Sequence, residues 1–109
     1  MQIDKEQRGH WLVLHVRGRL DATTVAEFDA AVEALSAEDT ARLVLDCAGL
    51  AYISSAGLRS ILSLAKKIRA GKGMLHFCGI AGMVKEVFDI SGFTGMFTIR
   101  DSVDAACRD

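Results

Sequence analysis

The chain has 109 residues, of which 50% are hydrophobic and 25% charged, and this balance fits one globular domain over residues 1–109. The net charge of −1 lacks the basic excess of a nucleic-acid-binding surface, so we expect no direct contact with nucleic acid. No apolar run approaches the ~20 residues that span a bilayer, and residues 1–6 are too polar for a signal peptide. We therefore expect a cytoplasmic protein without membrane insertion.

The N-terminal third predicts a hairpin followed by a helix. Residues Ile3–Glu6 and Trp11–Val16 predict two antiparallel strands with a turn near Arg8-Gly9. A helix is expected next, because Thr24 and Glu27 have the spacing of a capping box. Apolar residues follow at helical intervals, at Val25, Phe28, Val32 and Leu35. This stripe ends before the polar segment 36–40, for which no helix or strand is predicted.

The central third predicts a buried strand, a short loop and a long amphipathic helix. The near-continuous apolar segment Arg42–Cys47 is typical of a strand that is covered on both faces, as in the middle of a parallel sheet. The helix is expected to begin at Ser54 or Ser55 and to end before Gly71. Its apolar stripe consists of Leu58, Ile61, Leu62, Ala65 and Ile68.

The C-terminal third predicts two short strands and two helical segments. The strands are expected at Met74–Cys78 and Phe97–Arg100. Helical structure is expected at Met83–Ile90, which Ser91-Gly92 ends, and over one or two turns at Ser102–Cys107. The order β-β-α-β-α-β-α-β-α implies an α/β fold with a mixed sheet whose crossovers are helices. The loop before the long helix then lies at the carboxyl end of a strand, where α/β folds place functional groups.

The sequence lacks the motifs of common enzymes. A nucleophile elbow needs glycines on both sides of its serine, and Ser55 has Gly57 downstream but Ile53 upstream. The histidines lie in or beside predicted strands without an evident acidic partner: His10, His15 and His76. No metal-binding spacing or phosphate loop occurs, and the cysteines are too far apart for a disulfide framework or a C-x-x-C pair: Cys47, Cys78 and Cys107. We expect no enzyme activity, no metal and no cofactor.

Two adjacent hydroxyls, those of Ser54 and Ser55, stand at the predicted start of the long helix. A helix N-terminus presents unpaired N–H groups and a partial positive charge, so a serine there can be a cap, an anion ligand or a residue that is itself phosphorylated. A cap needs only one hydroxyl. The small residues Ala56 and Gly57 are expected to leave the neighbouring backbone open to a partner or a phosphate, and Tyr52 is either an aromatic anchor beside them or part of the core.

Three segments resemble the STAS domain and, more narrowly, the bacterial anti-sigma factor antagonists. The central one is Leu43-Val44-Leu45-Asp46 followed by Tyr52-Ile53-Ser54-Ser55-Ala56-Gly57-Leu58. Gly18-Arg19-Leu20-Asp21 is similar to the family's G-x-L-D element after the hairpin, and Phe88-Asp89-Ile90-Ser91-Gly92-Phe93 to its F-D-x-S-G-[LF] helix end. The resemblance covers nearly the whole chain. It implies a single STAS domain with helices packed mainly on one face of the mixed sheet.

In that family the central motif usually reads D-S-[ST]-G-L, and the serine after the aspartate is phosphorylated. The resemblance places this acceptor at Ser55, with Ser54 at the aspartate position and as the less favoured acceptor. It implies that Asp21 supports the phosphorylation site or partner docking. The partner-binding residues that it implies are Asp21, Ser54, Ser55, Ala56, Gly57 and Leu58.

The resemblance further implies an anti-sigma factor antagonist in a partner-switching pathway. The unphosphorylated form would bind an anti-sigma factor that is also an ATP-dependent serine kinase. Phosphorylation of Ser55 would end the complex, and a metal-dependent serine phosphatase would restore the binding form. The alternative is a non-catalytic STAS scaffold or accessory subunit, for example of a lipid-transport ABC complex or another signalling assembly. Ser54 in place of the aspartate removes a carboxylate beside the acceptor and keeps this alternative open.

Overall fold

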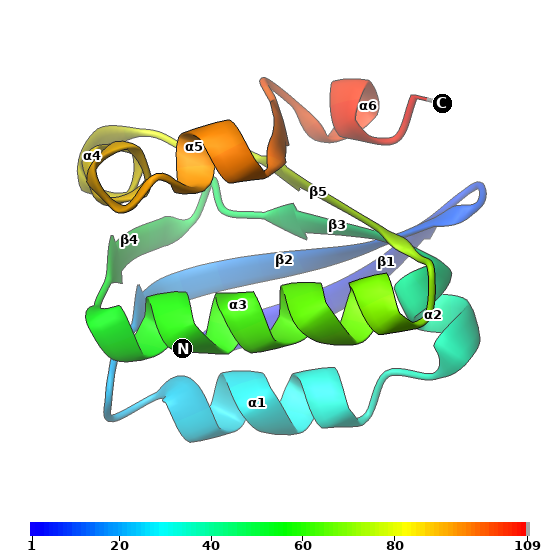
Figure 1. Ribbon diagram of the computed structural model, residues 1–109, viewed down its shortest axis with the longest axis horizontal. Helices are drawn as coiled ribbons and strands as arrows, with labels where there is room; N and C mark the ends of the chain where they lie inside the picture. The colour runs from blue at the N-terminus through cyan, green and yellow to red at the C-terminus, as the bar shows by residue number, and fades with distance from the viewer. Residues whose placement is uncertain (109) are drawn as a thin grey trace.

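A single mixed sheet organises the fold in the computed structural model of the protein, which describes residues 1–108 (Figure 1). The strands lie in the order β1-β2-β3-β5-β6, and β4 pairs with β2 beyond the end of β3. The β1–β2 pair is antiparallel and every other pair is parallel. The strands are β1 (Gln2–Arg8), β2 (Trp11–Leu20), β3 (Arg42–Asp46), β4 (Leu50–Ile53), β5 (Met74–Cys78) and β6 (Thr98–Arg100). The predicted α/β class with a mixed sheet is confirmed.

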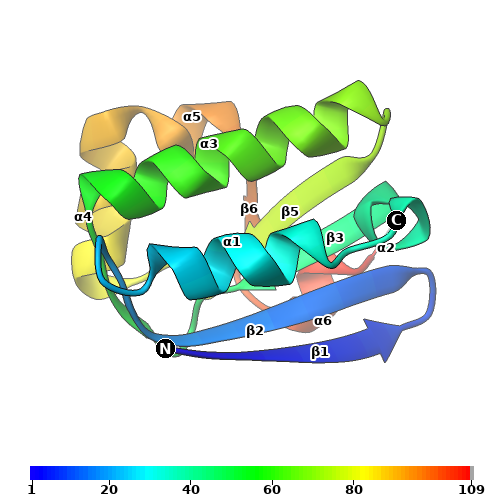
Figure 2. The same ribbon diagram turned by 90° about the horizontal axis from the view of Figure 1, so that it is seen from below.

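The helices cover mainly one face of the sheet. Helices α1 and α3 lie side by side across that face, whereas the short α6 lies on the opposite face (Figures 1 and 2). Helices α4 and α5 pack against each other next to β4, and α2 connects α1 to β3. The helices are α1 (Val25–Glu33), α2 (Ala37–Ala41), α3 (Ser55–Ala70), α4 (Gly82–Ser91), α5 (Phe93–Met96) and α6 (Val103–Ala106). The expected helical layer is therefore confirmed, with α6 as the exception.

The larger hydrophobic core lies between the sheet and the α1–α3 layer. Successive side chains of a strand point to opposite faces, so Leu12 and Leu14 of β2 enter this core together with Phe28 of α1 and Ile61 of α3. A smaller cluster lies on the other face, against α6, and consists of Trp11, Val13, Val44, Cys78 and Ala106. The side chains of β2 thus alternate between the two clusters.

The capping box forms at a different helix from the one that the sequence predicts. Thr24 is the N-cap residue of α1, but its hydroxyl makes no capping bond and instead accepts a hydrogen bond from Asp21 N at 3.0 Å. The capping box predicted from Thr24 and Glu27 is therefore wrong. A capping box does form between Ser36 and Asp39, at the start of α2, where no helix is predicted.

Strands β2 and β4 extend the sheet beyond the predicted elements. The sequence predicts a strand only over Trp11–Val16, but β2 continues to Leu20 through Gly18, whose φ of +98° favours glycine. The chain leaves β3, passes through residues 47–49 and re-forms as β4, which pairs with the extension of β2 where a loop is predicted. The sheet thus carries the chain through Ile53 directly to the start of α3.

Helix α5 is also absent from the sequence-based expectations. It follows Gly92, which ends α4 in the left-handed conformation with φ +84°. Phe93 at its start is buried and packs edge-to-face on the ring of Phe88, with centroids 5.3 Å apart. Within residues 1–108, no helix has the length and apolar character that crossing a membrane requires.

Candidate functional site

The serine pair lies where β4 meets α3. Ile53, the last residue of β4, is paired with Leu20, the last residue of β2. Ser54 N then donates to Leu20 O at 3.0 Å, which fixes the chain at the edge of the sheet. Ser54 is the N-cap of α3, and its Oγ accepts a hydrogen bond from Gly57 N at 3.3 Å. The predicted cap is therefore Ser54, and α3 begins at Ser55.

The two hydroxyls differ in exposure and in bonding. Ser54 is half-buried and its Oγ is engaged in the cap, whereas Ser55 is exposed. Within the part of the chain that the structure describes, the Ser55 hydroxyl makes no hydrogen bond. Ser55 also stands at the positive end of the helix dipole, in a first turn without acidic side chains. The structure thus gives one serine a structural contact and leaves the other available.

Gly57 lies differently from the expectation that it leaves the backbone open. The residue is buried, and a Cβ built on it would lie 2.8 Å from Leu20 O and 2.8 Å from Ile53 Cγ1. The backbone at this position is closed by β2 and β4, so the glycine permits a close approach of helix to sheet. Leu58 is half-buried and packs against the larger core, and Ala56 is half-buried at the surface of α3.

Asp21 directly follows β2, at the same edge of the sheet as the serine pair. Its Oδ1 accepts hydrogen bonds from Thr23 N at 2.9 Å and Thr23 Oγ1 at 2.7 Å. Its Oδ2 lies 3.4 Å from Arg19 Nε. The hydrogen bond from the Thr23 hydroxyl, supported by the other two donors, holds the pKa of Asp21 below its ordinary value. The carboxylate is therefore ionised at neutral pH and ordered by its own loop.

Arg19 is a member of this site that sequence reasoning does not single out. Its guanidinium carbon lies 4.2 Å from the centroid of the Tyr52 ring, a cation–π contact between the neighbouring strands β2 and β4. Arg19 is exposed and Tyr52 is half-buried. Their facing positions in the two strands could not be predicted, because β4 itself is not predicted. The half-buried Tyr52 ring thus carries the guanidinium of a surface arginine on one of its faces.

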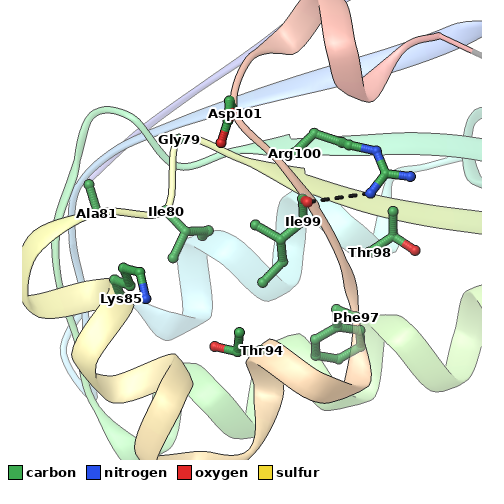
Figure 3. A pocket seen from close by; sticks show the side chains of 10 residues that line it. All are labelled: Gly79, Ile80, Ala81, Lys85, Thr94, Phe97, Thr98, Ile99, Arg100 and Asp101. Carbon is green, nitrogen blue, oxygen red and sulfur yellow. Dashed lines mark hydrogen bonds between the residues drawn. The ribbon is translucent and has the colours of Figure 1, made fainter.

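A separate cavity lies elsewhere in the fold (Figure 3). It has a volume of about 660 Å³, and Figure 3 shows its lining side chains projecting from α4, α5, β6 and the loop after β5. Its lining residues include Lys85, Thr94, Phe97 and Arg100 and none of the predicted site residues. Lys85 in this lining is paired with Asp89 at 2.9 Å.

Two histidines and two cysteines have hydrogen-bond partners within the fold: His15, His76, Cys47 and Cys78. The expectation that the histidines lack acidic partners is wrong for His15, whose ring nitrogens lie 2.7 Å from Asp46 Oδ2 and 2.7 Å from Glu6 Oε1. Hydrogen bonding to Glu6, with a smaller contribution from Asp46, raises the pKa of His15 above its ordinary value. Burial raises the pKa of the Cys78 thiol to about 12. No cluster of three or more potential metal ligands occurs within residues 1–108.

His76 is buried on the α6 side of the sheet. Its Nδ1 lies 2.9 Å from Ala106 O, and its ring stacks on Trp11 with centroids 4.5 Å apart. This contact joins α6 to the sheet, at the end of β2 opposite to the serine pair. His76 therefore stabilises the fold rather than the site.

The sequence and the fold both match known proteins. Residues 2–106 match the family model of the STAS domain. BtrV of Bordetella bronchiseptica, named as an anti-sigma factor antagonist, is 35% identical over 106 residues, which are 97% of this chain and 91% of BtrV. The crystal structure of an anti-sigma factor antagonist from Mycobacterium paratuberculosis superposes with a TM-score of 0.84 at 21% identity, covering 96% of this chain and 89% of that one.

The anti-sigma factor antagonist SpoIIAA of Bacillus has the same fold. Its phosphorylated form superposes with a TM-score of 0.71 at 18% identity, covering 95% of this chain and 96% of SpoIIAA. Its unphosphorylated form gives the same TM-score of 0.71 at 16% identity, covering 95% and 92%. At these low sequence identities the superpositions show a shared fold only. Membership of a family is shown by the family model and by the 35% identity to BtrV. The chain belongs to the STAS domain family.

Proposed function

We propose that the protein is an anti-sigma factor antagonist that works by partner switching in the cytoplasm, as one STAS domain over residues 1–109. In its unphosphorylated form it binds an anti-sigma factor that is also an ATP-dependent serine kinase. Phosphorylation of Ser55 ends this complex, and a metal-dependent serine phosphatase restores the binding form. The protein is the substrate in this cycle and not a catalyst.

The observation that carries the assignment to Ser55 is that only Ser54 has its hydroxyl engaged in capping α3. Ser55 Oγ is exposed and unbonded among the described residues, so a kinase can reach it without breaking a contact. Ser54 Oγ already accepts the Gly57 N–H, and a phosphate there would disturb the cap. BtrV and SpoIIAA are both named as anti-sigma factor antagonists, and SpoIIAA has a phosphorylated form, which supports the same cycle.

A phosphate on Ser55 suits the fold but not a bound partner. A phosphoserine adds about −1.5 to −2 charges at neutral pH. At the first residue of α3 this charge faces the unpaired N–H groups of the helix, an interaction of roughly 0.3–1 kcal/mol that favours the folded state. A partner packed on the same surface would meet a strongly hydrated dianion, and uncompensated charge at an interface costs roughly 2–5 kcal/mol. Binding is lost while the fold persists.

Asp21 and Ser54 have supporting parts in this proposal. The ionised Asp21 carboxylate, held by Thr23 and beside Arg19, orders the loop at the same sheet edge and offers a charged contact to the kinase. Ser54 occupies the position where the family usually has aspartate, and both residue types are good N-caps. The exchange therefore keeps α3 capped and removes one negative charge beside the acceptor.

The proposal is tested by phosphosite mapping with matched serine variants. Each purified candidate anti-sigma serine kinase is incubated with ATP, Mg²⁺ and the wild type, Ser55→Ala or Ser54→Ala. We expect one phosphoryl group on the wild type and on Ser54→Ala, and none on Ser55→Ala. Ser54→Ala is expected to lose about 1 kcal/mol of stability through its cap but to keep its acceptor. Phosphate on Ser55→Ala would show that another residue is the acceptor.

Binding to the same kinase, measured by calorimetry, tests the charge mechanism. Ser55→Ala is expected to bind as the wild type does, because it removes only a hydroxyl that makes no hydrogen bond among the described residues. Ser55→Glu is expected to bind more weakly. Equal affinity of the two variants would contradict repulsion by charge.

A further inference from the structure

Opposite charges are segregated onto the two helices that lie beside each other on the sheet. Residues 47–85 carry six cationic side chains and no acidic one: Arg59, Lys66, Lys67, Arg69, Lys72 and Lys85. Helix α1 has the reverse composition, with three acidic side chains and no cation: Glu27, Asp29 and Glu33. The net charge of −1 conceals this segregation. Because α1 and α3 are neighbours, an acidic helix and a basic helix run side by side (Figure 2).

A groove of about 540 Å³ separates these two helices. Val25, Val32 and Leu64 supply its apolar lining, and Ala56, Ser60 and Ser63 keep the α3 side low because their side chains are small. The α3 residues that line it recur at intervals of three or four, so they form one continuous helix face. From Ala56 to Lys67 this face is about 16 Å long, or roughly three helical turns.

Charged side chains stand on both rims of the groove. Asp29 and Glu33 rise from α1, and Arg59 rises from α3, and all of them are exposed. Within residues 1–108 none of these side chains takes part in an ion pair. Lys67 differs, because its Nζ donates to Val32 O at 3.1 Å and so fastens α3 to the end of α1. The groove therefore has a negative rim and a positive rim that do not neutralise each other.

The groove begins at the phosphorylation site. Ala56, one of its lining residues, is the neighbour of Ser55 in the first turn of α3. A kinase that holds the Ser55 hydroxyl in its active site must lie over this end of the helix. Resting on the function proposed above, we infer that the α1–α3 groove receives a segment of that kinase, with a cationic side chain toward Asp29 and Glu33 and a carboxylate toward Arg59.

The two oppositely charged rims set the orientation of the bound kinase segment, in addition to attracting it. The chain as a whole is close to neutral, so net charge alone gives little steering. Two rims of opposite sign favour one direction of the docked segment, because reversing it would place like charges together. Docking in the groove adds affinity that contact with the Ser55 hydroxyl alone cannot supply.

Charge reversals with matched controls test the inference. The probe is the kinase that phosphorylates Ser55 in the mapping experiment, and its Kd is measured by calorimetry against the unphosphorylated protein. Asp29→Lys and Arg59→Glu are each expected to weaken binding about tenfold, by placing like charges at the rim. Glu27→Lys and Lys66→Glu make the same charge changes on the same helices at exposed positions outside the groove, and they are expected to change Kd less than about twofold. Melting curves confirm that every variant is folded.

The double variant Asp29→Lys/Arg59→Glu separates docking from general electrostatics. Its net charge equals that of the wild type, but the polarity of the groove is reversed. The inference expects its binding to be at least as weak as that of either single variant. Wild-type affinity in the double variant, or equal effects of groove and control variants, would overturn the inference and leave the proposed function intact. A wild type that neither binds nor is phosphorylated by any candidate kinase would instead overturn the proposed function, and this inference with it.

Discussion

Replacing Gly57 by alanine tests how α3 is held against the sheet. The added methyl group would lie under 3.0 Å from three atoms, Leu20 O and Ile53 Cγ1 at 2.8 Å and Leu20 Cγ at 2.9 Å. Leu20 O cannot retreat freely, because it accepts the hydrogen bond from Ser54 N at 3.0 Å. The helix start must therefore move, and with it the residue that we propose as the phosphate acceptor.

The size of the effect follows from two opposing contributions. Overpacking a tight site costs about 1–3 kcal/mol, and the backbone contact places Gly57→Ala near the upper end. Alanine recovers about 1 kcal/mol through its better helix propensity. The net loss in the free energy of unfolding is about 2 kcal/mol, which lowers the melting temperature of a domain this size by roughly 10 °C.

Thermal melting followed by far-ultraviolet circular dichroism measures this loss, and Gly95→Ala is the matched control. Gly95 also lies in a helix, α5, but a Cβ built there meets nothing within 4 Å. We expect the control to melt at the wild-type temperature or slightly above it. If Gly57→Ala also melts there, the close approach of α3 to Leu20 is not what requires glycine.

Two further predictions concern titrating and polar groups. Glu6 and Asp46 raise the pKa of His15, so their contribution to stability is complete below its ordinary pKa of about 6.5 and is lost as pH rises through the folded value. Urea unfolding between pH 6 and pH 8, below the range in which the buried thiols titrate on unfolding, should show declining stability for the wild type and a flat profile for His15→Gln. A flat wild-type profile would refute this. Asp21→Asn keeps an oxygen for the Thr23 donors but loses the charge, so we expect nearly wild-type melting and slower phosphorylation of Ser55, and an unchanged rate would rule out a role for the charge.

The elements with strong periodicity were the ones that the sequence could predict. The run Arg42–Cys47 and the stripe that includes Ile61 and Ile68 mark β3 and α3 because their apolar residues are buried against the sheet. β4 has four residues and pairs with an extension of β2 that passes through Gly18. Neither partner is recognisable without the other, so this part of the sheet is a product of tertiary pairing.

Local capping signals were ambiguous for a physical reason. Thr24 and Ser36 are both followed three residues later by an acidic side chain. Only Ser36 has extended backbone, which aims its hydroxyl at the N–H of Asp39, whereas the ψ of Thr24 is −12° and its hydroxyl turns toward the preceding loop. The signal for α2 was therefore present in the sequence, but choosing between the two positions required backbone angles.

At the candidate site, the sequence located the serines but not their surroundings. The sequence predicts that α3 starts at Ser54 or Ser55, because a hydroxyl before an amphipathic stripe is a sufficient signal. The burial of Gly57 and the stacking of Arg19 on Tyr52 both depend on β4, so no local pattern could reveal them.

The placement of Trp11 gives the molecule an intrinsic optical reporter. This residue is the only tryptophan in the sequence, is 2% exposed and stacks on His76 against α6. It begins β2, whereas Leu20 ends that strand beside the serine pair, and this length of strand spans about 30 Å. We therefore expect the indole emission to report unfolding of the α6 face and to change little on phosphorylation of Ser55, so that fluorescence can distinguish the two events without any label.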